Sequence, residues 1–525
     1  MANLRAVPCA EGIIQSARVD RACAAGAKPW VLVATILASS IAYIDESVVN
    51  VALPAIETEL ATTAVVIQWL VNAYTLCLSA FLLVGGAAGD RFGSRRLLVI
   101  GMSVFAVSSL WCGLSPSIAQ LISARAVQGF GAALLIPSSL ALIGATFDET
   151  ERGKGTWSGF SALAAAAGPL VGGWIVDHFS WRWIFLINPL LALPTIWIAC
   201  LRVPETRNPD TKPGLDWQGT FLALASLGSL SYGLIAWPNS GWNDEVVLSS
   251  LIAGLALFAA FLWVEHQSHA PMLPLALFRS RTFSAVNLLT LFLYSALGGA
   301  MFFVPFALIQ VRGYPATIAG AAFLPFTIIM AGLSRWAGGL VDRFGARLPL
   351  IVGPAIAALG FGLMALTVSR GSYLVFLIPI VVLGFGMVIS VAPLTTTVIN
   401  SVPAHQTGVA SGINNAVAST ANLVAVATLG AVALAVFDHA LDRQLQTGGL
   451  AASVRQAIES ARGTFVVEPA LSGIGGADRL IAQTIIKGSL AQGIQSVMLI
   501  VAALAFAAAA AGALIPRSRT GVSRS

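Results

Sequence analysis

Charged residues are scarce in this chain of 525 residues, where Asp, Glu, Lys and Arg together make up 10%. Soluble proteins carry about 25% of them, which argues against an ordinary soluble protein. Five cysteines cannot form a disulfide scaffold for a chain of this length, and no GxxxxGK[ST] loop occurs that would bind ATP. The five histidines form no paired metal or catalytic motif. We therefore expect no enzyme, no metal, no cofactor and no use of ATP.

Hydrophobic residues, in contrast, make up 57% of the chain and are gathered in blocks of about 20 residues. We count fourteen such blocks, each long enough to cross a bilayer as a helix. The sequence therefore predicts an all-α integral membrane protein. The formal net charge of +6 reflects topology and does not indicate a nucleic-acid partner.

The distribution of positive charge predicts the orientation of the spans. Most of the 29 Lys and Arg residues lie in the two tails and in loops on the same side as the tails. The positive-inside rule then places both termini in the cytoplasm. We expect the chain to span the inner membrane of the cell. The expected cytoplasmic tails are residues 1–29 and 516–525. The long segment 438–487 falls outside, either as a connector or as a vestibule for substrate.

A repeated motif divides the chain into related halves. The second span ends in GGAAGDRFGSRR, Gly85 to Arg96, and the tenth ends in GGLVDRFGAR, Gly338 to Arg347. Eight spans separate the two copies, whereas two six-helix halves would require six. The spacing therefore predicts a 6+2+6 arrangement, with six-helix bundles at 30–201 and 283–515 and two inserted helices within 202–282.

These motifs resemble those of the major facilitator superfamily, and within it the fourteen-span drug:proton antiporters. IDESVVNVALP (Ile44 to Pro54), SARAVQGFGAA (Ser123 to Ala133), AAAAGPLVGGW (Ala164 to Trp174) and WRWIFLINPL (Trp181 to Leu190) resemble motifs of spans one, four, five and six. The resemblance implies the major facilitator fold, with two pseudo-symmetric bundles. It also implies conformational gating by the repeated turn and antiport through the span-five motif. The gating residues are Gly86, Asp90, Arg91, Gly93, Arg95, Gly338, Asp342 and Arg343, and the antiporter residues are Gly168, Pro169, Gly172 and Gly173.

Ionisable residues deep in a bilayer are costly and usually functional. Asp45 and Arg125 lie at matching depths in spans one and four, roughly 13 and 15 Å below the same surface at 1.5 Å per residue. Their pairing would form a proton switch, or a static pair that fixes the helix register. Glu46 is either a second coupling carboxylate or a packing residue beside Asn50.

Proton-driven export of amphipathic, cationic compounds is the function that these features favour. The alternatives are export of one dedicated metabolite, proton symport and a membrane sensor without transport. The expected partners are small-molecule substrates, protons and the lipid bilayer, and we expect a monomer. Aromatic and polar residues of a substrate cavity would be Asn50, Trp69, Tyr74, Trp157 and Phe160, although the aromatic ones are also typical core residues.

Overall fold

The computed structural model describes residues 13–14, 21–147, 167–207, 214–268, 271–403, 406–446 and 450–516. Within these residues, thirteen helices are long and apolar enough to cross a membrane. The expected fifth span lies partly outside the described residues, but residues 167–178 of it are helical. The all-helical fold predicted from the hydrophobic blocks is therefore confirmed.

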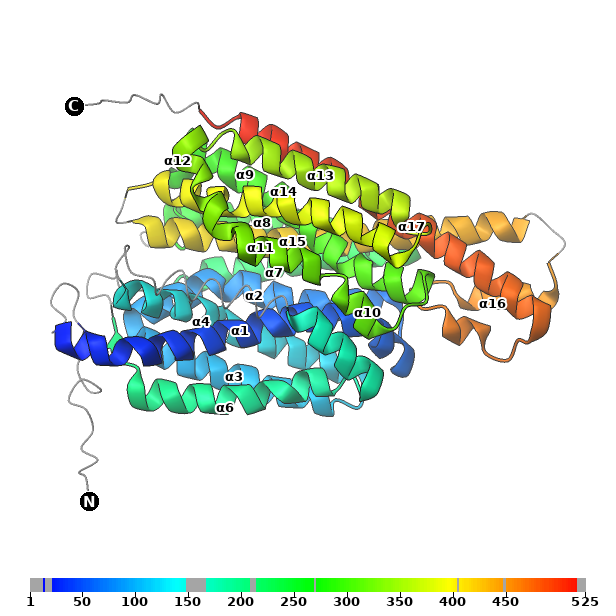
Figure 1. Cartoon of the computed structure of the whole chain (residues 1–525), viewed down its shortest axis with the longest axis horizontal. Helices are drawn as coiled ribbons and strands as arrows, with labels where there is room; N and C mark the ends of the chain where they lie inside the picture. The colour runs from blue at the N-terminus through cyan, green and yellow to red at the C-terminus, as the bar shows by residue number, and fades with distance from the viewer. Residues whose placement is uncertain are drawn as a thin grey trace, which may run out of the picture.

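Helices of the N-terminal half pack against one another in the lower layer of Figure 1. Serine, threonine and glycine residues between the apolar side chains allow these helices to approach closely. The helices are α1 (Arg21–Glu59), α2 (Ala64–Phe92), α3 (Ser94–Leu114), α4 (Ile118–Thr146) and α6 (Trp183–Arg202). Helix α1 begins well before the expected start of the first span at Trp30.

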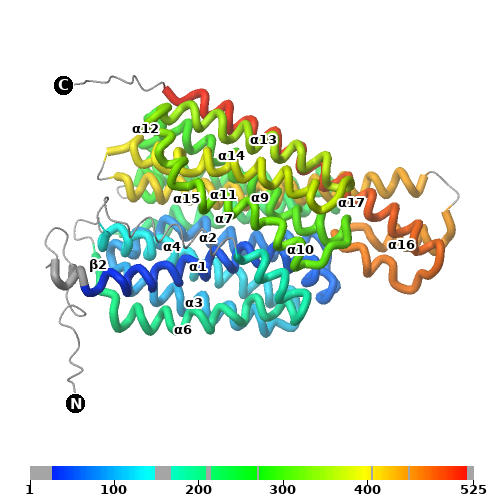
Figure 2. Tube along the Cα trace, in the orientation of Figure 1, coloured from blue at the N-terminus to red at the C-terminus, as the bar shows by residue number. Residues whose placement is uncertain are grey.

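The C-terminal half forms the upper layer (Figures 1 and 2). Its expected spans nine and ten are interrupted, the first by a π-helical turn and the second by short breaks. Its elements are α9 (Arg281–Phe306), η3 (Ala307–Val311), α10 (Ala316–Ala321), α11 (Leu324–Gly338), α12 (Leu340–Phe344), α13 (Pro349–Thr367), α14 (Tyr373–Asn400), α15 (Thr407–Gln446) and α17 (Gly476–Ala513).

Two further helices, α7 (Trp217–Ser240) and α8 (Glu245–Gln267), pack against each other outside both bundles. Helix α7 contacts α2 of the N-terminal half and α15 of the C-terminal half. These are the helices that the repeat spacing places between the halves. A short 3₁₀ helix, η2 (Leu275–Arg279), connects the pair to α9.

The described parts of the segment 438–487, residues 438–446 and 450–487, are folded. Helices α15 and α17 run on past the rest of the bundle, and α16 (Ala452–Ser460) and η5 (Glu468–Leu471) lie between them. They project at the right of Figure 1, which we call the α16 end; the opposite end, where α1 begins and α17 ends, we call the terminal end. At the terminal end, β1 (Ile13–Ile14) pairs in parallel with β2 (Glu205–Thr206).

The folded segment contacts both halves at the α16 end. The Phe465 amide donates to Glu57 of α1 at 2.7 Å, and the Val467 amide donates to Gln310 of η3 at 3.0 Å. The Phe465 ring also packs edge-on against Phe303 of α9, with ring centroids 5.5 Å apart. The segment therefore joins the two halves and is more than a simple connector.

Candidate functional site

Three of the sequence motifs converge on the carboxylate of Asp45. Arg125 of α4 forms an ion pair with it, with Nη1 2.5 Å from Oδ2. The other oxygen, Oδ1, accepts hydrogen bonds from Gln128 at 2.9 Å and from Asn188 of α6 at 2.7 Å. Asp45 and Arg125 are each only 1% exposed. The contact expected from their matching depths is present, and both side chains are buried.

The ion pair is held in place by further side chains. Arg125 also donates to Gln128 Oε1 at 2.8 Å, and its guanidinium lies 4.1 Å from the centre of the Tyr74 ring. Asn188 donates in addition to Ser109 Oγ at 2.9 Å. Gln128 and Asn188 were not identified from the sequence as site residues. In the sequence, Gln128 and Asn188 stand out only because each lies within a motif that resembles the family's motifs.

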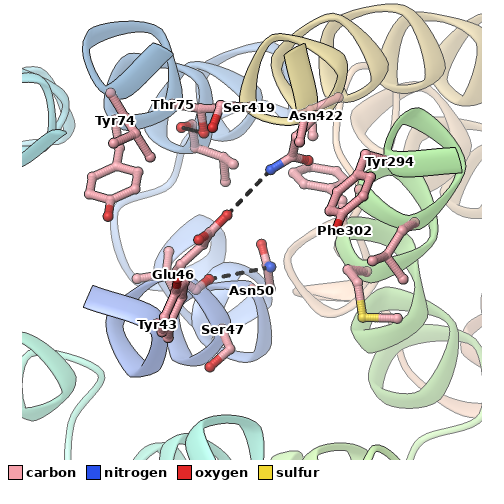
Figure 3. Close-up of a pocket in the computed structure, with 18 of the residues that line it drawn as sticks. Tyr43, Glu46, Ser47, Asn50, Tyr74, Thr75, Tyr294, Phe302, Ser419 and Asn422 are labelled. Carbon is pink, nitrogen blue, oxygen red and sulfur yellow. Dashed lines mark hydrogen bonds between the residues drawn. The ribbon is translucent and has the colours of Figure 1, made fainter. Parts of the chain in front are cut away.

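Glu46 has different surroundings from its neighbour Asp45. Its side chain is half-buried and lines a central cavity of about 380 Å³. Across this cavity Asn422 of α15 donates to Glu46 Oε1 at 3.5 Å, so the contact joins the two halves (Figure 3). One step along a helix rotates a side chain by about 100°. Asp45 can therefore pair with Arg125 while the neighbouring Glu46 faces the central cavity.

Polar and aromatic side chains from both halves line the central cavity, as Figure 3 shows. Its volume lies within the ~300–1,000 Å³ range of small-molecule sites. Among the described lining residues, Glu46 and Arg125 carry the charges, whereas the polar groups include Tyr43, Ser47, Asn50, Thr75, Tyr294, Ser419 and Asn422.

The residues expected from the sequence to line the cavity do not all do so. Asn50 and Tyr74 line it, and the Asn50 side chain donates to the Glu46 carbonyl at 3.4 Å. The Trp69 ring does not line it and lies 6.5 Å from the Tyr232 ring of the inserted helix α7. Trp157 and Phe160 lie outside the described residues.

The glycines of the span-five motif allow close contacts in two directions. A β-carbon at Gly168 would overlap the Ser47 hydroxyl of α1, and one at Gly172 would lie 2.8 Å from Val48. On another face, a β-carbon at Gly173 would overlap the backbone of Ala316 at the start of α10. Pro169 lines the central cavity. The motif thus packs α1 and α10, which belong to opposite halves, against one helix.

Asp177, a few residues further on, strengthens the same junction. Its carboxylate accepts hydrogen bonds from the amides of Ala316 at 3.0 Å and Thr317 at 2.7 Å. A side chain of the N-terminal half therefore satisfies the free amides at the start of α10 in the C-terminal half. Asp177 was not recognised as a site residue from the sequence, because an acidic residue at a span end is common.

The turn between α2 and α3 depends on a different glycine from the one expected. A β-carbon at Gly85 would overlap the Ala133 carbonyl of α4, whereas one at Gly86 would be 3.6 Å from Pro137, an ordinary contact. Gly93 has φ 110°, a conformation that favours glycine. The close approach of α2 to α4 therefore occurs at Gly85.

Glu205, which follows α6, holds this turn. Its carboxylate accepts from the Arg95 amide at 3.0 Å and lies 3.6 Å from the side-chain nitrogens of Arg95 and Arg96. A β-carbon at Gly93 would be 2.5 Å from the same carboxylate. Glu205 was also missed in the sequence, since it lies far from the motif along the chain.

The two copies of the repeated turn can be compared residue by residue in the structure. Arg91 is exposed and lies over the Phe92 ring at 5.3 Å, and Asp90 is partly exposed. In the second copy, Asp342 and Arg343 are exposed, and nothing lies within 4 Å of a β-carbon at Gly338. Gly345 has φ 70° at the position that corresponds to Gly93. Both copies therefore end a helix at a glycine with positive φ.

No group of three or more His, Cys, Asp or Glu residues within the described ranges could hold a metal ion. The charges of the central site are those of the protein side chains themselves. The central cavity thus places the Glu46 carboxylate beside a space large enough for a small molecule.

Known proteins resemble this chain over most of its length. Residues 35–426 match the sequence profile of the Major Facilitator Superfamily. The chain belongs to this superfamily. It is 33% identical to Multidrug resistance protein Stp of Mycobacterium tuberculosis, over 79% of this chain and 78% of that protein. It is 32% identical to the Tetracenomycin C resistance and export protein of Streptomyces glaucescens, over 77% and 76% of the two chains.

The fold is also found in solved transporter structures. The crystal structure of a bacterial homolog to the human lysosomal transporter Spinster superposes with a TM-score of 0.64. The match covers 94% of this chain and 99% of the other, at 17% sequence identity, so it shows the shared fold alone. The protein is a multi-pass membrane transporter of the major facilitator fold, as the sequence motifs predicted.

Proposed function

We propose that the protein exports amphipathic, cationic compounds across the cell membrane in exchange for protons. Glu46 carries this proposal, because it is a carboxylate that faces a cavity formed by both halves. A divalent cationic substrate would displace a proton from this carboxylate, which would add a second proton to the one exchanged at Asp45. The relatives named for drug resistance and export support a drug as the substrate.

Asp45 and Arg125 would form the second part of the mechanism. In the present conformation Arg125 neutralises Asp45, and the pair fixes α1 against α4. Protonation of Asp45 would remove its attraction for the arginine and so change which packing of the halves is preferred. Because the contacts of Asp177 and Phe465 join the halves at the α16 end, we infer that this conformation opens toward the terminal end.

We propose that the transporter is a monomer. In its proposed orientation, the terminal end lies in the cytoplasm. The positive charge of the tails and adjoining loops supports this. A reporter inserted between Gly448 and Gly449 should then be accessible only from outside, and one after Arg517 only from inside. The reverse labelling pattern would contradict the proposed orientation.

Transport itself can be tested in everted membrane vesicles that carry a pH gradient. We expect addition of a divalent cationic dye to dissipate the gradient in vesicles with the wild-type protein. Vesicles with the Glu46→Gln variant at equal abundance should respond less. A gradient that is unchanged by every dye of a cationic and neutral panel would contradict drug:proton antiport.

Export of one dedicated metabolite is the second candidate. It is supported by relatives named after a single antibiotic, such as the Tetracenomycin C resistance and export protein. The same vesicle assay distinguishes the two, since a dedicated exporter should respond to one compound class and to none of the structurally unrelated dyes.

A further inference from the structure

A second cavity, of about 480 Å³, lies between the inserted helices and the two bundles. Helices α7 and α8 form its outer wall, and α2, α9 and α15 form its inner wall. Its lining residues fall in the halves of these helices nearer the terminal end, and the segment 272–278 closes it there. We call it the lateral cavity.

Helices α2 and α15 lie between the lateral cavity and the central one. On α2, Leu82 lines the central cavity and Leu83 lines the lateral cavity. On α15, Ser419 lines the central cavity and Thr420 lines the lateral one. The two cavities therefore lie on different faces of α2 and α15, and the lateral cavity belongs to no site described above.

The lining of the lateral cavity suits a hydrocarbon chain. No charged residue is among the described residues that line it. Its largest polar side chain, Asn287, donates to the Phe283 carbonyl at 2.9 Å and accepts from Asn414 at 3.2 Å. Since the amide is satisfied within the protein, a cationic or strongly polar ligand would bury its charge without a partner.

Part of the lining, on α8 and α9, is exposed. Phe258 of α8 is 41% exposed, and Leu288 and Leu291 of α9 are 37% and 36% exposed. Exposed apolar side chains at membrane depth contact lipid tails. The rim between α8 and α9 thus gives the surrounding lipid access to the cavity.

Two arginines lie beside the closed end of the cavity. Arg279 directly follows the lining residue Phe278, and Arg281 begins α9; both are exposed. The first turn of α9 also presents the positive end of its helix dipole, which favours a phosphate. Basic groups at this depth attract anionic lipid headgroups.

Two acidic side chains in the described part of this end, Glu265 and Asp216, accept hydrogen bonds from backbone amides. Glu265 accepts from the Leu273 amide at 3.0 Å and so holds the closing segment in place. Asp216 accepts from the Gly219 amide at 2.8 Å and caps α7. Among the described residues beside the cavity, the exposed charges named here are therefore those of Arg279 and Arg281.

From this arrangement we propose that the lateral cavity binds an anionic phospholipid of the adjoining leaflet. One acyl chain occupies the cavity, and the phosphate contacts Arg279 and Arg281. The bound lipid fills the space between the inserted helices and both bundles, so it stabilises the attachment of α7 and α8. This inference does not depend on the transported substrate.

Native mass spectrometry of the full-length protein in detergent tests the proposal. The probes are phosphatidylglycerol and phosphatidylethanolamine with identical acyl chains. Wild-type protein should retain one phosphatidylglycerol molecule, with at least tenfold preference over phosphatidylethanolamine. Ala223→Phe, which fills the cavity from α7, should lower binding at least tenfold. Ala225→Phe is the matched control, because Ala225 is exposed on the same helix and does not line the cavity.

The headgroup contact is tested separately with Arg279→Gln and Arg281→Gln combined. This variant should lose the preference for phosphatidylglycerol while it still binds a lipid. If Ala223→Phe does not fold, judged by thermal unfolding in the same detergent, Ala416→Leu fills the cavity from α15 instead. Equal lipid retention by the wild-type and cavity-filled proteins would overturn the proposal. Binding of a cationic dye that Ala223→Phe abolishes would also overturn it, because the cavity would then belong to the substrate.

Discussion

Thr317 is held by the carboxylate of Asp177 from the opposite half of the transporter. The Thr317 amide and hydroxyl donate to Asp177 Oδ2 at 2.7 and 2.6 Å. Together with the close packing of Gly173 on Ala316, this contact closes the α16 end. A conformational change that opens this end must break it.

We expect Asp177→Ala to shift the population away from the conformation closed at the α16 end. Loss of these hydrogen bonds to a charged acceptor should destabilise that conformation by about 2 kcal/mol, or roughly 30-fold in population. Spin-label distances between the halves at the α16 end would measure the shift. Asp244→Ala is the control, since Asp244 also caps a helix but only within the inserted pair. Equal distance distributions in Asp177→Ala and wild type would show that this contact does not close the end.

Adjacent glycines of the α2–α3 motif should respond differently to the same change. Gly85→Ala places a methyl group against the Ala133 carbonyl, whereas the methyl group of Gly86→Ala meets only an ordinary contact. Overpacking typically costs about 1–3 kcal/mol. We therefore expect Gly85→Ala to lower the unfolding temperature and transport, and Gly86→Ala to leave both nearly unchanged. Thermal unfolding of the two purified variants measures this, and equal stabilities would contradict it.

These glycines show what the sequence could and could not predict. The motif and its position were evident, because turn residues and the end of a hydrophobic block can be read directly. Which glycine faces α4 depends on the rotation of α2 about its axis. Successive residues of a helix point in directions about 100° apart. The sequence contains no information on that rotation without knowledge of the neighbouring helix.

The same distinction applies to the site around Asp45. Depth along a helix follows from residue counting, so the Asp45–Arg125 contact could be predicted. Gln128 and Asn188 are neutral amides, whose presence in a span has little cost and therefore gives little signal. Asp177 and Glu205 act on backbone groups far away in the chain, and such contacts form only once the helices are packed.

Arg125→Ala should leave the Asp45 carboxylate buried without its counter-charge. Breaking a buried pair in this way typically destabilises a protein by about 3–5 kcal/mol. We expect a lower unfolding temperature and loss of transport. Arg125→Lys should restore transport only in part, because an ammonium cannot reproduce the planar contacts with Asp45, Gln128 and Tyr74. Full transport by the alanine variant would exclude a role for the ion pair in coupling.

In the proposed exchange of substrate for protons, the number of protons would set which substrates can be exported. One proton entering down a potential of roughly 150 mV releases about 3.5 kcal/mol, and each pH unit adds about 1.4 kcal/mol. A monovalent cation exchanged for one proton moves no net charge, so the pH gradient alone drives it. A divalent cation exchanged for one proton is opposed by the potential, and a second proton would make the exchange electroneutral. Two separate carboxylates, one sealed and one facing the cavity, could carry these two protons.

We therefore expect Asp45→Asn to abolish export of every substrate, because the sealed switch is lost. Glu46→Gln should retain export of neutral and monovalent compounds but lower that of divalent ones at least tenfold, since only the second proton is lost. Efflux of a matched monovalent and divalent dye pair from cells with equal amounts of each variant measures both effects. Asn422→Ala is the control, because it removes the partner of Glu46 without removing a titrating group. Equal efflux of the two dyes by Glu46→Gln would assign Glu46 to packing, and active export by Asp45→Asn would remove Asp45 from the coupling site.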